Sequence, residues 1–113
     1  MTPEDFVAQV RNAVVEQGSI GDKDLLESAS AETVSDPYWK RLLTLYHSLN
    51  SYDRNTFLEI LRQIRIDTLV QLFCILDGVC TLENSPEDFE LKTMGDGQKI
   101  NGNLQHLFLG EDE

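Results

Sequence analysis

The feature that most constrains the fold is a near-neutral apolar centre between two acidic flanks. Residues 37–82 place 24 apolar side chains in 46 positions, together with four acids and five bases. Residues 1–36 and 83–113 each carry eight acids and two bases, which is a net charge of −6 on either side. The 113-residue chain therefore carries −11 at pH 7. One hydrophobic centre in a chain of this length predicts a single domain over residues 1–113.

Capping signals and apolar residues at helical spacing divide this centre into helices. Asp36 followed by Pro37 is typical of a helix start, and we expect that helix to end near Asn50. Ser51 predicts the start of a second helix, whose apolar residues reach Ile64. Both segments contain few β-branched residues for their apolar content, which favours helices over strands.

A third helix of the centre is predicted from Thr68 to Asp77, capped by Asp67 and ended by Gly78. Its apolar side chains cover most of the circumference, so we expect it to be central and buried on several sides. The helices between Pro37 and Gly78 should then form the core of the protein.

The acidic N-terminal flank also begins with a helix signal. Thr2 is a suitable N-cap and Pro3 a suitable first helical residue, and Gly18 is expected to end this helix. A short helix is predicted over residues 22–28, followed by a loop over residues 28–35. The N-terminal helix should pack around the core.

The C-terminal flank changes its period from helical to alternating. Residues 89–94 alternate apolar and polar side chains before a turn signal at residues 95–97, which predicts a small β-hairpin packed on the helices. A short final helix is predicted over residues 104–109, and residues 111–113 are expected to be frayed. The predicted fold class is mainly α (α+β): a single-domain bundle of about four helices with a C-terminal hairpin and a short final helix.

The residues that most often carry chemistry show no catalytic spacing. His47 and His106 have no acid or nucleophile nearby at the spacing of a catalytic triad. Cys74 and Cys80 lie six residues apart, which is not the spacing of a zinc or redox motif. Cys74 is flanked by apolar residues and is predicted to be a core thiol that stays reduced. We therefore expect a protein that is not an enzyme and uses no metal or cofactor.

The charge and the apolar pattern exclude two classes of partner. Direct binding to nucleic acid or to an anionic membrane surface requires clustered Lys and Arg, which this chain lacks. The most apolar stretch, residues 69–76, is too short to cross a bilayer. Residues 1–5 carry acids where a secretory signal carries bases, so the expected location is the cytoplasm.

The acidic flanks themselves are the candidate binding site, either as a docking face for a basic protein or as a solvated surface. The partner-binding residues predicted from the sequence are Asp22, Asp24, Glu27, Glu87, Asp88 and Glu90. The aromatic residues that could anchor such a partner are Tyr38, Trp39, Tyr46 and Tyr52.

Several short segments between residues 37 and 109 carry a family resemblance. They are Asp53-Arg54, Glu59, Arg62, Arg65-Ile66-Asp67, Leu76-Asp77-Gly78, Phe89-Glu90-Leu91 and Asn101-Gly102-Asn103-Leu104-Gln105. With these segments the chain resembles a group of small acidic bacterial proteins of unassigned function, some of which are similar to immunity proteins of polymorphic or contact-dependent toxin systems. The resemblance implies a role in binding a partner protein and brings no site residues with it.

The predicted function is a non-catalytic acidic protein-binding module of the bacterial immunity type, which binds and neutralises a basic toxin domain. One alternative is a nucleic-acid mimic that inhibits a DNA-binding protein. Mimicry requires carboxylates spaced like phosphates along an extended face, whereas here a neutral centre separates the acids. The other alternative is a small enzyme.

Overall fold

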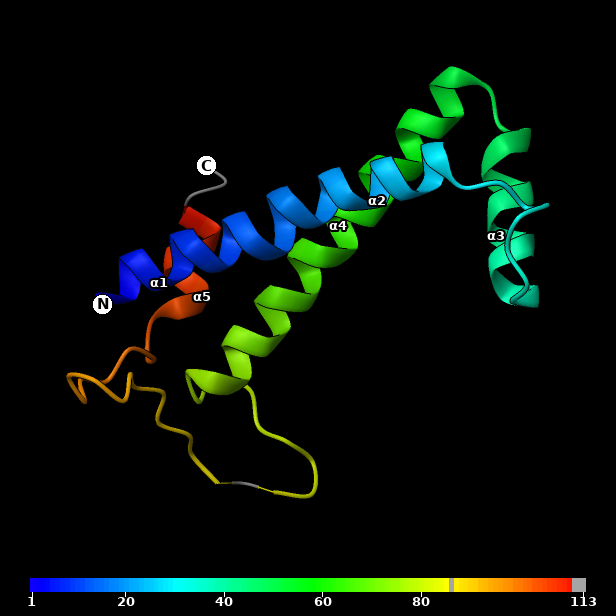
Figure 1. The fold of residues 1–113 in the computed structure, drawn as a ribbon. Coiled ribbons are helices and arrows are strands. Elements are labelled where there is room, and N and C mark those ends of the chain that lie inside the picture. The colour runs from blue at the N-terminus through cyan, green and yellow to red at the C-terminus, as the bar shows by residue number, and fades with distance from the viewer. Residues whose placement is uncertain (86, 111–113) are drawn as a thin grey trace.

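Two long helical runs form the body of the molecule, as Figure 1 shows in a computed structural model that describes residues 1–85 and 87–110. The helical elements are α1 (Pro3–Val10), the π-helix η1 (Arg11–Glu16), α2 (Gln17–Ser28), α3 (Pro37–Ser48), α4 (Ser51–Leu76) and α5 (Leu104–Gly110). The elements α1, η1 and α2 follow one another without a break, and α4 is the second long run. The fold is therefore mainly α, as predicted, and elongated, with extents of 49 × 32 × 27 Å. The fraying expected at residues 111–113 falls outside the described residues.

Helix starts lie where local capping predicts them. The Thr2 hydroxyl accepts a hydrogen bond from Asp5 N at 3.1 Å, and Pro3 follows as the first helical residue. Asp36 caps α3 by accepting from Tyr38 N at 2.8 Å. The side chain that caps α4 is Asn50, one residue before the expected Ser51.

Two predicted helix boundaries are wrong, because the chain continues helically through both. Gly18 was expected to end a helix, but it lies inside the first helical run, where the Arg65 guanidinium packs against it. A Cβ at Gly18 would lie 2.5 Å from Arg65 Nη1, so the glycine permits a close approach. Asp67 was expected to cap a new helix, but its carboxylate accepts from the Gln63 amide at 2.9 Å within α4.

The end of α4 is predicted correctly, but the state of its cysteine is not. Gly78 has a φ of +79°, and the following Val79 and Cys80 amides both donate to Cys74 O at 3.1 Å. Cys74 is buried, as expected of a core residue. It is not a reduced thiol, however, because it forms a disulfide with Cys80. The prediction of reduced cysteines came from the expected cytoplasmic location, whereas the turn at Gly78 brings the two Cα atoms to 5.2 Å.

The predicted C-terminal hairpin is wrong, since the described residues contain no β-strand. One antiparallel bridge joins Lys92 to Lys99. Beyond it, the Asn101 side chain replaces a strand partner: its Oδ1 accepts from Leu91 N at 2.7 Å, and its Nδ2 donates to Phe89 O at 2.8 Å. A single buried side chain thus takes the backbone groups that a ladder would have paired.

The buried residues form two hydrophobic clusters at different places along the long helices. The first is built from Val7, Val15, Leu69, Phe73, Ile100, Leu104 and Phe108. The second is built from Leu26, Leu43 and Tyr46, with Trp39, Leu42, Phe57, Leu58 and Leu61 against them. The core therefore does not reside in residues 37–78 alone, because α1, η1 and α5 complete the first cluster. None of the described helices has the length and apolarity needed to span a membrane.

Candidate functional site

The structure separates the predicted partner-binding acids into two groups. Asp22, Asp24 and Glu27 lie on α2, at the end of the molecule where α3 packs. Residues 87–90 lie in the segment between α4 and α5, at the other end of the molecule (Figure 1). The two acidic flanks therefore do not form one surface.

Asp22 is tied to α4 and is not free to meet a partner. Its two carboxylate oxygens accept from Arg65 Nη2 at 2.8 Å and from Arg65 Nε at 3.0 Å. This paired contact raises the pKa of Arg65, which also donates to Val14 O at 3.2 Å. Asp22 thus holds the crossing of α2 and α4, a role that only the folded chain reveals.

Glu27 has a structural partner as well. Its carboxylate accepts a hydrogen bond of 2.7 Å from the Tyr46 hydroxyl, which joins α2 to α3. Burial, followed by this hydrogen bond, raises the pKa of Tyr46. The Arg54 guanidinium lies over the Tyr46 ring at 5.3 Å. Glu27 is nevertheless exposed.

The remaining four predicted acids meet only solvent. Asp24, Glu87, Asp88 and Glu90 are exposed and make no hydrogen bond or ion pair with any residue that the structure describes. These four carboxylates are available to a partner, one on α2 and three in the segment before α5.

An apolar pocket of about 180 Å³ lies between α2, α3 and α4. It is lined by Asp22, Leu25, Leu26, Tyr38, Trp39, Leu42, Phe57 and Leu61. Leu25 and Tyr38 are 46% and 61% exposed, so the rim presents large apolar side chains to solvent. Residues 22–28 looked like a weak helix in the sequence. Their adjacent leucines, Leu25 and Leu26, were the available signal for this site.

Two of the four expected aromatic anchors belong to this pocket. Tyr38 and Trp39 line it from the first turn of α3. Tyr46 is fully buried in the second cluster and is a core residue. Tyr52 is 79% exposed at the start of α4 and does not line the pocket.

Two acids are associated with the pocket: Asp22 lines it, and Asp36 caps the helix that carries Tyr38 and Trp39. The Asp36 carboxylate accepts from the backbone amides of both Tyr38 and Trp39. Residues 22–36 carry five acids and one base, a net charge of −4. We call the segments over residues 22–39 the α2–α3 face; Leu25, Tyr38 and Trp39 line its pocket, and Asp24, Glu27, Glu32 and Asp36 are acids of the same segments.

The histidines take no part in this site. His47 Nε2 donates to Ala29 O at 3.0 Å and thereby fastens the loop that precedes α3. His106 is exposed on α5. Among residues 1–85 and 87–110, no cluster of three or more His, Cys, Asp or Glu side chains could hold a metal ion.

No protein-family model, curated protein or solved structure matches this chain.

Proposed function

We propose that this protein is a non-catalytic acidic binding module of the bacterial immunity type, which neutralises a basic toxin domain by docking it on the α2–α3 face. The observation that carries the proposal is an apolar pocket lined by partly exposed aromatic side chains, which lies between segments whose residues 22–36 carry a net charge of −4.

The two parts of this face have different physical roles in the proposed complex. Tyr38, Trp39 and Leu25 supply apolar area that a partner can bury, and interface energy concentrates on such anchors. Asp24 and Glu32 supply long-range attraction, which raises the rate of encounter with a cationic surface. The acids at residues 87–90 line neither described pocket, so we assign them no anchor role.

Stopped-flow association with the protein encoded by the neighbouring gene tests the proposal. The test variant is Asp24→Lys/Glu32→Lys, because neither side chain makes a hydrogen bond or ion pair in the described structure. The matched control is Glu87→Lys/Asp88→Lys, which changes the charge by the same amount at the other end of the molecule. Co-expression of the neighbouring protein with each variant adds a growth readout of neutralisation.

We expect the α2–α3 variant to associate several-fold more slowly at low salt, while the control associates like the wild type. The difference should shrink as salt rises, because the screening length falls from about 10 Å at 0.1 M toward about 3 Å at 1 M. Dissociation rates should change less, since the apolar anchors govern them. Equal association rates for the wild type and both variants would contradict the proposal.

The compartment is part of the proposal. The expected location is the cytoplasm, whereas the Cys74–Cys80 disulfide supports an oxidising compartment, because disulfides are rare in the cytosol. Thiol alkylation in acid-quenched cells distinguishes the two: cytoplasmic protein should carry two alkylated cysteines, and protein from an oxidising compartment none.

A further inference from the structure

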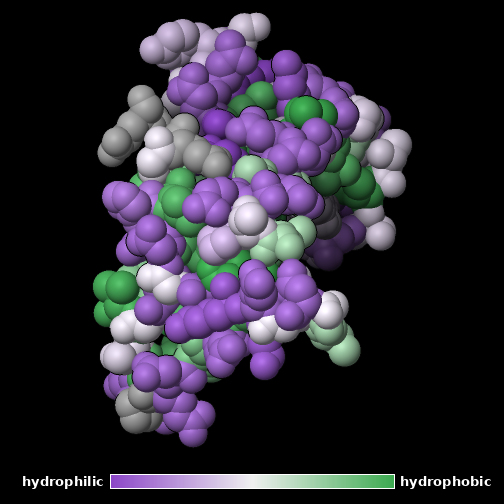
Figure 2. Space-filling view, turned by 90° about the vertical axis from the view of Figure 1, so that its left-hand side faces the viewer, coloured by the Kyte–Doolittle hydropathy of each residue, from purple (hydrophilic) through white to green (hydrophobic). Residues whose placement is uncertain are grey.

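A second cavity lies at the end of the molecule away from the α2–α3 face. Its volume is about 420 Å³, within the range of about 300–1,000 Å³ that small-molecule sites show. Met1 and the first helical run form one wall, to which the helix supplies Phe6, Val10, Ala13 and Val14. The segment before α5 supplies Leu91, Lys92, Thr93 and Ile100. Figure 2 views the molecule from this side and shows hydrophobic patches between hydrophilic residues. The lining is thus mostly apolar, with few polar groups.

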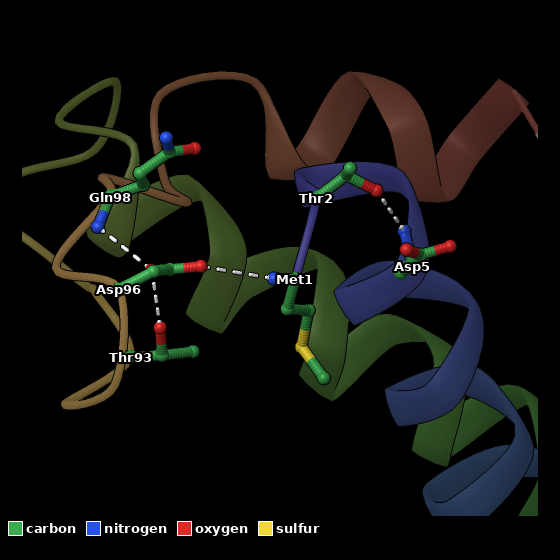
Figure 3. Close-up of polar contacts among 6 residues, drawn as sticks. All are labelled: Met1, Thr2, Asp5, Thr93, Asp96 and Gln98. Carbon is green, nitrogen blue, oxygen red and sulfur yellow. Dashed lines mark hydrogen bonds and ion pairs between the residues drawn. The ribbon is translucent and has the colours of Figure 1, made fainter.

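The outer wall of this cavity is fastened by side-chain contacts of Asp96 (Figure 3). Its carboxylate accepts from the Thr93 hydroxyl at 2.6 Å, from Gln98 N at 3.0 Å and from the Met1 amine at 3.3 Å. At the base of this turn, where its two arms meet, Ile100 N donates to Leu91 O at 2.7 Å. The wall is therefore held in place without a ligand, as is usual for small-molecule sites.

Two lysines stand together at this wall. Lys92 lines the cavity, and Lys99 lies directly opposite Lys92 in the antiparallel bridge. Opposite residues of such a pair project to the same side, where like charges repel. In a chain with 20 acids, neither lysine makes an ion pair with any described residue. This arrangement leaves two positive charges for an anion beside an apolar cavity.

The helix that forms the inner wall is also unusual here. Ala13 and Val14 belong to the π-helix η1, and both line the cavity. Short π-helical segments are often found at functional sites, because the wider turn alters the spacing of side chains on one face. Ala13 is small and exposed, which leaves room above the helix.

We propose that this cavity binds a single-chain amphiphile with a carboxylate head, such as a fatty acid. The chain lies against Phe6, Val10 and Val14, and the carboxylate lies between Lys92 and Lys99. The site is independent of the proposed toxin-binding role, since it uses neither α2 nor α3.

Titration of the full-length protein with decanoate below its micelle concentration tests this site, with decanol as the uncharged counterpart. Two-dimensional amide NMR should show shifts over residues 6–14 and 91–100. The charge variant is Lys92→Gln/Lys99→Gln, and its matched control is Lys23→Gln/Lys40→Gln, which removes the same charge from α2 and α3. Ala13→Phe fills the cavity from an exposed position.

We expect Lys92→Gln/Lys99→Gln to weaken decanoate binding about tenfold, the loss expected for two partly exposed charge pairs, and to leave decanol binding unchanged. The Lys23→Gln/Lys40→Gln control should bind both ligands like the wild type, and Ala13→Phe should bind neither. Absence of decanoate binding to the wild type overturns the proposal. So do shifts centred on Leu25 and Trp39, or equal decanoate affinities for the two lysine variants.

Discussion

At the scale of single residues, the absence of a side chain at Gly18 lets the two long helical runs approach closely where they cross. The Arg65 guanidinium occupies the space of a Cβ and from there reaches both Asp22 and Val14 O. A glycine inside a helix costs about 0.5–1 kcal/mol relative to alanine. Here that cost is offset by an ion pair whose side chains are only 33% and 25% exposed.

A double-mutant cycle tests this account. In the Arg65→Ala background, Gly18→Ala should raise the free energy of unfolding by about 0.5–1 kcal/mol, because only helix propensity changes. In the wild type the same substitution should bring no gain, since the added Cβ displaces the guanidinium from Asp22. Urea denaturation measures both effects. Equal effects in the two backgrounds would show that the guanidinium and Gly18 are not coupled.

A second residue-scale prediction concerns acid sensitivity. The hydrogen bonds from Thr93 and Gln98 N, together with the Met1 amine, lower the pKa of Asp96 to about 2 from its usual 3.8. Because the folded state holds the proton less tightly, the contribution of Asp96 to stability is complete above about pH 4 and is lost as the pH falls toward 2. The wild type should therefore exceed Asp96→Asn in stability at pH 5, and the two should converge near pH 2.

At the scale of elements, α5 owes its start to a residue from the end of α4. The Asp77 carboxylate accepts from Gly102 N at 2.7 Å, Leu104 N at 3.1 Å and Gln105 N at 2.9 Å. Asp77 thus acts as an N-cap for α5, although it precedes Leu104 by 27 residues in the sequence. This contact fixes both ends of the segment between α4 and α5.

Replacing Asp77 with alanine should lower the free energy of unfolding by about 2 kcal/mol, because three backbone donors lose their acceptor. This value is the upper end of the range of about 0.5–2 kcal/mol that the loss of a helix cap costs. The control is Asp67→Ala on the exposed side of α4, which loses only the contact with Gln63 and should cost less than about 0.5 kcal/mol. Chemical denaturation checks both. Similar costs for the two variants would argue against a cap supplied by Asp77.

The elements also show which features a sequence can reveal. The caps at Thr2 and Asp36 were predictable, because each uses atoms within three residues of the cap. The continuity of the helix through Gly18 was not predictable, because tertiary packing against Arg65 outweighs the local signal of a glycine. At Asp67 the carboxylate bonds to the Gln63 side chain, one turn earlier in the same helix, and does not act as a cap. The predicted hairpin failed for a similar reason: Asn101 reaches back to Leu91 and satisfies its amide without a strand.

The candidate sites divide in the same way. Composition indicated that Asp22 and Glu27 are surface acids, but their partners Arg65 and Tyr46 lie 43 and 19 residues away in sequence. Spacing along one helix carries no information about such contacts. The acids Glu87, Asp88 and Glu90 are exposed, and their part in binding a partner stays a prediction.

At the scale of the whole molecule, the two hydrophobic clusters are separated by a polar crossing. Along the helices, the ion pairs Arg62–Glu16 at 3.0 Å and Arg65–Asp22 at 2.8 Å lie between the cluster around Phe73 and the cluster around Tyr46. Surface-exposed ion pairs contribute little to stability compared with apolar burial. Each end of the molecule is therefore stabilised mainly by its own cluster.

Hydrogen exchange should reveal this division. Amides of α3 and of the first half of α4 should exchange together, at a lower free energy of opening than amides near Phe73 and Phe108. The second cluster is smaller, and its loss leaves the first intact. The substitution Leu43→Ala should accelerate exchange in α3 while the amides of α5 keep their protection. A single uniform opening free energy across both clusters would contradict the division.

The separation of the clusters also bears on how such a protein changes over generations. Each end has its own buried residues and its own candidate surface, and the crossing touches each of them at one residue: Asp22 lines the pocket, and Val14 lines the cavity. The pocket beside Tyr38 and the cavity beside Lys92 share no lining residue. A lineage of this fold can therefore vary the residues that line one site while those that line the other stay unchanged.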